Sequence, residues 1–144
     1  MRVYILKVGG LAQRSNGKPP DAYVRVRLGQ ETYDTKKEFK SAATHADIYR
    51  VFEFQSATLP GDSTLEVAVL DANLLGFDDV VGHTELDLED RVFSTMWNTH
   101  HYHKPPIEKR YLQTNGSTMH QGWITMFVER KPFQPLNNTP AHSL

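Results

Sequence analysis

The sequence predicts an all-β fold, an antiparallel β-sandwich of eight strands. Three observations lead to this prediction: short segments alternate apolar and polar residues, turn-forming residues separate them, and only the stretch 89–97 has a helical pattern. The 144 residues suffice for one domain with a single core, which we expect to span residues 1–130. Residues 131–144 hold three of the eight prolines and no periodicity, so we expect a linker or disordered tail there.

Alternation is the main signal for the strands. Side chains alternate across a strand, so in the segment 22–29 we expect Val24, Val26 and Leu28 to face the core and the residues between them to face solvent. The predicted strands, in chain order, are Arg2–Val8, Ala22–Gly29, Tyr33–Phe39, Arg50–Ser56, Thr64–Asp71, Val80–Leu88, Lys109–Thr114 and Gly122–Glu129.

Composition and charge exclude several classes of function. The chain has 16 Lys and Arg against 17 Asp and Glu, so no bulk charge draws it to nucleic acid, and any electrostatic targeting must be local. It has no cysteine, which excludes disulfides, a thiolate nucleophile and Cys-ligated zinc, and which fits a reducing compartment. No segment resembles a signal peptide or is long enough to span a bilayer, so we expect the chain as given to be soluble.

One loop combines acids with large apolar residues. The segment Leu70–Gly82, LDANLLGFDDVVG, places two leucines and a phenylalanine among three aspartates and an asparagine. Carboxylate and amide oxygens are ligands that calcium prefers, whereas apolar side chains on a loop are suited to an apolar surface. The loop therefore indicates a cation site next to an apolar tip.

Four segments, taken together, resemble a C2 domain. They are MRVYILKVGGL, NGKPPDAYVRVRLG, LEVAVLDANLLGFDDVVGHTELDLEDRVFS and GWITMFVE, and they resemble most closely the C2 domains of ferlins, large membrane-anchored proteins with many such domains. The resemblance extends in order over residues 1–130. It implies an eight-stranded β-sandwich whose loops at one end bind Ca²⁺ and phospholipid, in agreement with the strands predicted from alternation.

The resemblance also implies the calcium ligands, two acids from the loop after the first strand and three from the loop after the fifth. Asp21 matches the second acid of the first pair, but Arg14 or Ser15 stands where the first acid is expected. Calcium affinity follows the charge and number of the ligands, and Arg14 would bring a positive charge if it pointed inward. This half of the site is therefore expected to be incomplete.

The later loop supplies the remaining ligands. Asp71 and Asp79 match its first and last acids, while Asn73 stands at the middle position and offers an oxygen without charge. Asp78 lies beside the site and is expected to help through water or through its field. We expect calcium to bind weakly or not at all. The alternative is that Asp71, Asn73 and Asp79 only shape the loop through Asx turns.

Two apolar side chains occupy the tip of this loop. Leu75 and Phe77 are predicted to insert into a membrane, where their burial would contribute about 2–5 kcal/mol together. The alternative is that one of them folds back onto the sandwich together with Leu74.

A second membrane feature is a set of basic residues predicted on neighbouring strands two to four. Such a face binds phosphoinositide headgroups in related domains. The alternative is that these basic residues are only solvated surface. The set comprises Arg25, Arg27, Lys36, Lys37, Lys40 and Arg50.

No motif predicts an enzyme. His100, His101 and His103 are adjacent, but neighbouring side chains on a strand or loop diverge, so we expect solvated histidines rather than a metal site. The chain lacks a G-x-S-x-G elbow, a P-loop and a G-x-G-x-x-G fingerprint.

The predicted function is peripheral binding to anionic phospholipid membranes. We expect a monomeric module on the cytoplasmic face of membranes, part of a membrane-anchored ferlin-like protein of vesicle trafficking or membrane fusion. Two alternatives remain: a calcium-independent module that binds other domains of the same parent protein, and a regulatory C2 domain of a lipid-acting enzyme.

Overall fold

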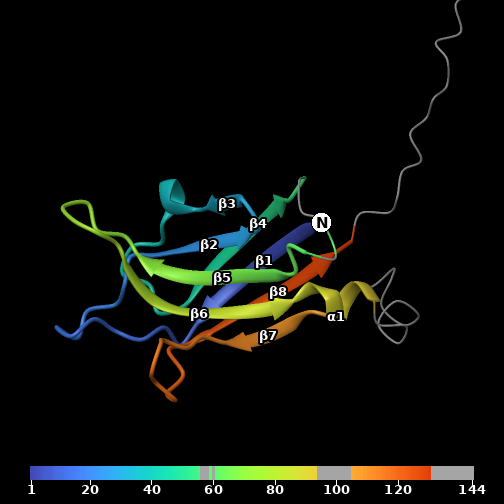
Figure 1. Cartoon of the computed structure of the whole chain (residues 1–144). Helices are drawn as coiled ribbons and strands as arrows, with labels where there is room; N and C mark the ends of the chain where they lie inside the picture. The colour runs from blue at the N-terminus through green and yellow to red at the C-terminus, as the bar shows by residue number, and fades with distance from the viewer. Residues whose placement is uncertain (56–58, 60, 94–104, 131–144) are drawn as a thin grey trace, which may run out of the picture.

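Two four-stranded antiparallel sheets pack face to face in the computed structural model, which describes residues 1–55, 59, 61–93 and 105–130 (Figure 1). One sheet has the strand order β4-β1-β8-β7 and the other the order β3-β2-β5-β6. The predicted eight-stranded sandwich is confirmed. The strands are β1 Arg2–Gly9, β2 Ala22–Leu28, β3 Glu31–Asp34, β4 Ala46–Glu53, β5 Thr64–Asp71, β6 Asp79–Asp87, β7 Glu108–Tyr111 and β8 Trp123–Glu129.

The third predicted strand, Tyr33–Phe39, is wrong beyond its first two residues. It ends at Asp34, whose carboxylate accepts the Lys36 backbone N–H at 3.0 Å, and a 3-10 helix, η1, then spans Lys36–Glu38. An aspartate that bonds the backbone two residues further on favours a turn over a continued strand.

Three other elements have shifted bounds. The strand predicted to end at Thr114 ends at Tyr111. The strand predicted to begin at Arg50 begins four residues earlier, at Ala46, because β4 pairs with β1 along that whole stretch. The predicted helix is α1, Leu88–Phe93, with the Asp87 carboxylate bonded to the Glu89 backbone N–H at 2.9 Å. The rest of the predicted helix, the histidines at 100, 101 and 103, the end of the fourth predicted strand and the tail 131–144 lie outside the described residues.

The core lies between the two sheets. Val24 and Val26 are fully buried and Leu28 is 1% exposed, so the predicted inward face of β2 is confirmed. Tyr23 departs from the pattern: it lies on the outer face of β2 but is only 4% exposed, because the segment after η1 folds over it and packs Phe39 against the same small cluster. A short stretch of chain thus covers part of the outer face of this sheet.

Four loops meet at one end of the sandwich, on the left in Figure 1: residues 10–21, 35–45, 72–78 and 112–122. Backbone hydrogen bonds join them. The Leu11 N–H donates to the Thr44 carbonyl at 3.1 Å, the Ala12 N–H to the Gln121 carbonyl at 3.0 Å, and the Ala72 N–H to the Asp21 carbonyl at 2.8 Å. The loops therefore form one connected surface.

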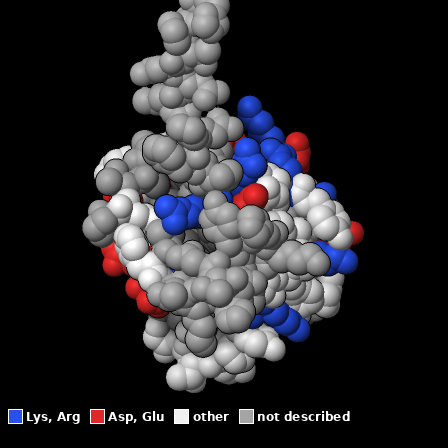
Figure 2. Space-filling view, turned by 90° about the vertical axis from the view of Figure 1, so that its right-hand side faces the viewer, with Lys and Arg blue, Asp and Glu red and all other residues white. Residues whose placement is uncertain are grey.

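The opposite end has mixed charge. Lys and Arg side chains lie near Asp and Glu side chains around its uncovered part (Figure 2). This mixture agrees with the near-equal numbers of basic and acidic residues in the sequence. No helix within the described residues is long and apolar enough to cross a bilayer.

Candidate functional site

The loop end brings four of the five predicted calcium ligands together. Asp21, Asp71, Asn73 and Asp79 line one hollow of about 450 Å³. A basic residue, Arg14, lies among them. Chain direction explains the meeting, since β1, β2, β5 and β6 all begin or end here. The structure therefore brings these four residues together as predicted, but the Arg14 guanidinium lies among them.

Arg14 is bonded to the most buried of these acids. Its Nε donates to Asp71 Oδ2 and its Nη2 to Asp71 Oδ1, both at 2.5 Å, and Nη2 also lies 3.4 Å from Asp21 Oδ2. Asp71 is only 6% exposed, so its charge requires compensation. A planar guanidinium that meets both oxygens of a carboxylate provides that compensation with good geometry.

The electrostatics of the pair follow from these bonds. The Arg14 guanidinium, helped by the Asp21 backbone N–H, holds the pKa of Asp71 below its usual value, and burial of Asp71 acts in the opposite direction. The same hydrogen bonds to Asp71 raise the pKa of Arg14. Both groups are thus charged at neutral pH.

The remaining oxygens of Asp21 and Asn73 also have partners. Asp21 Oδ1 accepts the Ala42 backbone N–H at 2.9 Å, which ties the loop 35–45 to the site. Asn73 Oδ1 accepts the Leu75 backbone N–H at 3.0 Å, an Asx turn. Asn73 therefore makes the bond that the turn-shaping alternative requires.

Asp78 belongs to a separate network. Its Oδ2 lies 2.7 Å from Lys36 Nζ and accepts the Tyr23 hydroxyl at 2.6 Å, while its Oδ1 accepts the Asn73 backbone N–H at 2.8 Å. The Lys36 ammonium first, then the Tyr23 hydroxyl and the Asn73 N–H, lower the pKa of Asp78 to about 2. The sequence did not predict the Lys36 contact.

This network predicts a pH dependence of stability. The folded-state pKa of Asp78 is lower than the unfolded value of about 3.9, so its contribution is present above about pH 4 and is lost as the pH falls toward 2. We expect Asp78→Asn to flatten the dependence of the unfolding free energy on pH in that interval, and Tyr23→Phe to flatten it partly. Urea denaturation at a series of pH values measures this. An unchanged slope in Asp78→Asn would contradict the assignment.

Calcium does not fit the residues in this arrangement. Arg14 places a positive charge against Asp71 and Asp21, where the resemblance places the ion, and Asn73 has its oxygen in a turn. Asp79 is exposed and its carboxylate has no partner among the described residues. Within that part of the chain, no cluster of three or more His, Asp or Glu side chains is arranged to hold a metal ion.

The large apolar side chains at the tip of the loop 72–78 are exposed to solvent. Leu75 is 99% exposed and Phe77 is 96% exposed, and their neighbour Leu74 is 83% exposed. The alternative that one of them folds back with Leu74 is therefore wrong. Leu74 itself is a tip residue that the sequence prediction left out. A second loop at this end, 112–122, exposes Met119.

The predicted basic face is not a single face. Strand β4 lies in the other sheet, so Arg50 is not next to the arginines of β2 and instead pairs with Glu38 of η1. Lys36 and Lys37 are in η1 rather than on a strand, and Lys40 follows it. The prediction of neighbouring strands two to four is wrong because chain order does not determine order within a sheet.

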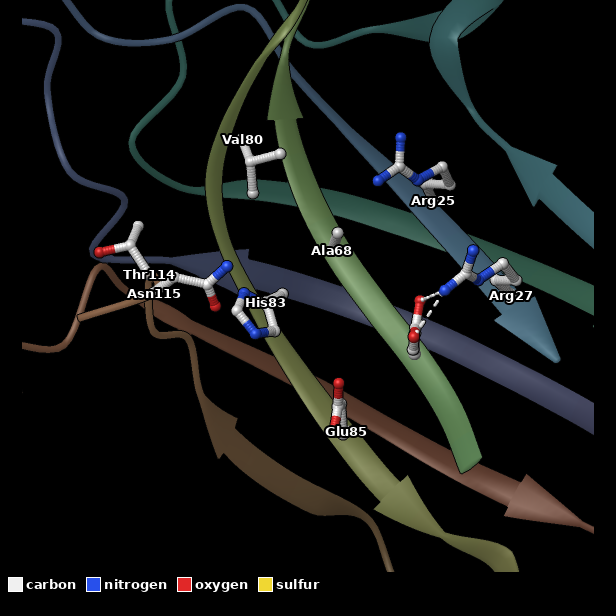
Figure 3. Close-up of a pocket in the computed structure, with 9 residues that line it drawn as sticks. Arg25, Arg27, Ala68, Val80, His83, Glu85, Thr114 and Asn115 are labelled. Atoms are coloured by element: carbon white, nitrogen blue, oxygen red, sulfur yellow. Dashed lines mark hydrogen bonds and ion pairs between the residues drawn. The ribbon is translucent and has the colours of Figure 1, made fainter. Parts of the chain in front are cut away.

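The two arginines of β2 line a groove of about 410 Å³ on the outer face of the sheet β3-β2-β5-β6. Figure 3 shows them on one side of Ala68, with His83 and Glu85 on the other. Arg27 Nη2 lies 2.6 Å from Glu66 Oε2, whereas Arg25 has no ion pair among the described residues. The groove therefore has mixed charge, with one of its two arginines in an ion pair.

Comparison with known proteins agrees with the β-sandwich fold. The C2 domain family matches residues 1–104. Mouse Fer-1-like protein 4 is 39% identical over 94 residues, 65% of this chain and 5% of that protein. The Caenorhabditis elegans sperm vesicle fusion protein fer-1 is 28% identical over 97 residues, 67% of this chain and 5% of that protein. The chain thus spans about one twentieth of the length of these relatives.

A solved structure shows the same fold. A C2 domain of plant Extended Synaptotagmin 1 superimposes with a TM-score of 0.71 at 19% identity, covering 93% of this chain and 95% of that one. The β-sandwich described above is thus shared with a domain of little sequence identity. The chain belongs to the C2 domain family, and its sequence relatives are ferlins.

Proposed function

We propose that this C2 domain binds phospholipid membranes peripherally and that the loop 72–78 is the docking element. One observation carries the proposal: Leu74, Leu75 and Phe77 are each more than four-fifths exposed and project from one short loop. Soluble proteins rarely expose neighbouring large apolar side chains without a partner. Burial of Leu75 and Phe77 in acyl chains contributes about 2–5 kcal/mol, enough for transient attachment.

The loop is ordered before any contact. The Asn73 side chain bonds the Leu75 N–H at 3.0 Å, and the Asp78 side chain bonds the Asn73 N–H at 2.8 Å. These bonds close the loop at its base and leave the apolar side chains outside. A loop that already has its bound shape loses little conformational entropy on docking, so more of the burial energy remains as affinity.

The proposal extends to the parent protein. We infer a module of a membrane-anchored ferlin-like protein that docks on the cytoplasmic face of membranes during vesicle trafficking or membrane fusion. The support is the similarity to ferlins, one of which is named for vesicle fusion. Calcium dependence is weak or absent, because Arg14 compensates Asp71 within the protein. The role is binding rather than catalysis.

A tryptophan reporter tests the docking proposal. Phe77→Trp places the probe at the tip, and Ile107→Trp places a control at an exposed site before β7, at the other end of the sandwich (Figure 1). The chain has two native tryptophans, so the emission of the wild-type chain is subtracted from that of each variant. With vesicles of phosphatidylcholine and phosphatidylserine, we expect a blue shift and quenching by brominated acyl chains in the difference spectrum of Phe77→Trp only. If vesicles leave the emission wavelength of Phe77→Trp unchanged, or shift it equally in both variants, insertion of the loop is refuted.

Phosphoinositide binding by the basic residues remains a prediction. Arg25→Glu with Lys37→Glu should weaken binding to vesicles that contain a phosphoinositide by about tenfold or more, since each basic residue near an anionic surface contributes about 1 kcal/mol. Higher salt should weaken it as well. The matched control is Lys7→Glu with Lys109→Glu, on the other sheet. Equal effects of the two pairs would assign the loss to net charge alone.

A second candidate function is contact with another domain through the sheet β4-β1-β8-β7. The Tyr4 and Phe127 rings stack on its outer face with centroids 4.2 Å apart, and Val51, paired with Tyr4 across β1 and β4, is 51% exposed. Tyr49, also on β4, is 60% exposed. Tyr49→Ser with Val51→Ser should leave vesicle binding unchanged and should weaken binding to neighbouring domains of the parent protein, measured by calorimetry.

A further inference from the structure

Arg14 extends from an ordered turn. Its backbone N–H donates to the Lys18 carbonyl at 2.9 Å, and its carbonyl accepts the Gly17 N–H at 2.8 Å. The Asn16 side chain closes the same turn by accepting the Lys18 N–H at 3.0 Å. The guanidinium is therefore delivered to the hollow by a fixed piece of backbone, and its side chain is about one-third exposed.

The guanidinium joins two segments that are far apart in the sequence. It bonds both oxygens of Asp71, at the end of β5, and approaches Asp21, just before β2. Asp71 Oδ1 also accepts the Asp21 backbone N–H at 2.9 Å. Without a cation here, two carboxylates would face each other across the hollow with Asp79 nearby, and like charges at such distances repel.

The side-chain oxygens of Asn73 and Asp78 at the loop end already have hydrogen-bond or ion-pair partners. Asn73 Oδ1 bonds the Leu75 N–H, and Asp78 is neutralised by Lys36 and bonded by Tyr23. Calcium needs about six to eight oxygens, so the hollow would have to lose several of these bonds to hold it. Among the described residues of the hollow, only the exposed Asp79 carboxylate has no such bond.

We propose that the Arg14 guanidinium takes the place of the calcium ion at this end of the sandwich, so that the loops are assembled and ready to dock without calcium. This inference deepens the docking function above by stating its regulation: calcium neither triggers nor is required. It also predicts a latent site. Removal of the Arg14 charge leaves Asp21, Asp71 and Asp79 around an uncompensated hollow that a divalent cation can then stabilise.

Thermal unfolding without lipid tests this proposal, so it can fail separately from membrane docking. The wild-type chain and Arg14→Ala are melted in chelator and in about 5 mM CaCl₂, a concentration in the range where weak calcium modules bind. We expect a shift below about 1 °C for the wild type, and for Arg14→Ala a lower melting temperature in chelator that calcium raises by about 3–6 °C.

The matched control is Arg27→Ala, which also removes an arginine from a carboxylate pair but lies on the outer face of β2. It should be as insensitive to calcium as the wild type. Arg14→Gln, which keeps a polar end without charge, replaces Arg14→Ala if the latter does not fold. A calcium-induced rise in the wild type as large as in the Arg14 variants, or no rise in any Arg14 variant, would overturn the proposal.

Discussion

Replacing Leu75 and Phe77 together by glutamate is expected to lower binding to anionic vesicles at least about 30-fold. The reason is the loss of about 2 kcal/mol or more of apolar burial, to which the cost of placing two carboxylates at an anionic surface is added. Both side chains are almost completely exposed, so the folded state loses no packing. Vesicle co-sedimentation measures the effect, and the melting temperature should stay within a few degrees of the wild-type value.

The matched control carries the same two charges elsewhere. Phe93 and Ile107 are 58% and 64% exposed, one at the end of α1 and the other just before β7, away from the loop end (Figure 1). Phe93→Glu with Ile107→Glu should reduce binding only slightly. A second variant, Leu75→Ala with Phe77→Ala, removes the apolar side chains without adding charge and should still lose most of the binding. Equal losses in the tip and control variants would show that general charge repulsion is responsible.

The largest loss of stability among the variants of the site is expected for Asp71→Ala. The substitution leaves the Arg14 guanidinium with only the distant Asp21 oxygen at 3.4 Å, and it leaves the Asp21 backbone N–H without its acceptor. Breaking a buried pair by removing one partner costs several kcal/mol, and the partial exposure of Arg14 reduces that figure, so we expect about 2–4 kcal/mol. Urea denaturation with an unchanged m-value measures it.

A double-mutant cycle separates the ion pair from the other roles of Asp71. Arg14→Ala with Asp71→Ala should cost less than the sum of the two single variants by about 1–3 kcal/mol, because each single variant leaves an uncompensated charge. A loss below about 0.5 kcal/mol in Asp71→Ala would mean that the pair behaves as an ordinary surface salt bridge. The position of Arg14 in the hollow would then contribute little to the stability of the fold.

The sequence predicted the parts of the structure that depend on local pattern. Alternation alone placed Val24 and Val26 in the core, and both are fully buried. Leu75 and Phe77 were predicted at an apolar tip because they lie among acids on the loop that the resemblance places at the membrane, and both are almost completely exposed. Asn73 was predicted either to bind an ion or to shape a turn, and its Oδ1 accepts the Leu75 N–H, as the turn requires.

Features that depend on three-dimensional neighbours could not be predicted in the same way. The contact of Lys36 with Asp78 arises because the chain turns at Asp34 into η1 and returns over the outer face of the sheet. Arg50 lies away from the β2 arginines because β4 joins the sheet of β1. The sequence also could not predict the orientation of the Arg14 side chain. A long flexible side chain on a loop can point to solvent or to a buried acid, and the sequence pattern is the same in both cases.

The central claim, that this module docks through its apolar tip without calcium, is tested most directly by the affinity of the wild-type chain for phosphatidylcholine–phosphatidylserine vesicles in chelator and in about 1 mM free Ca²⁺. We predict measurable binding in chelator and a partition coefficient that calcium changes by less than about twofold, because Arg14 already compensates Asp71. Binding that disappears in chelator and returns with calcium would contradict the claim, as would the absence of binding under both conditions.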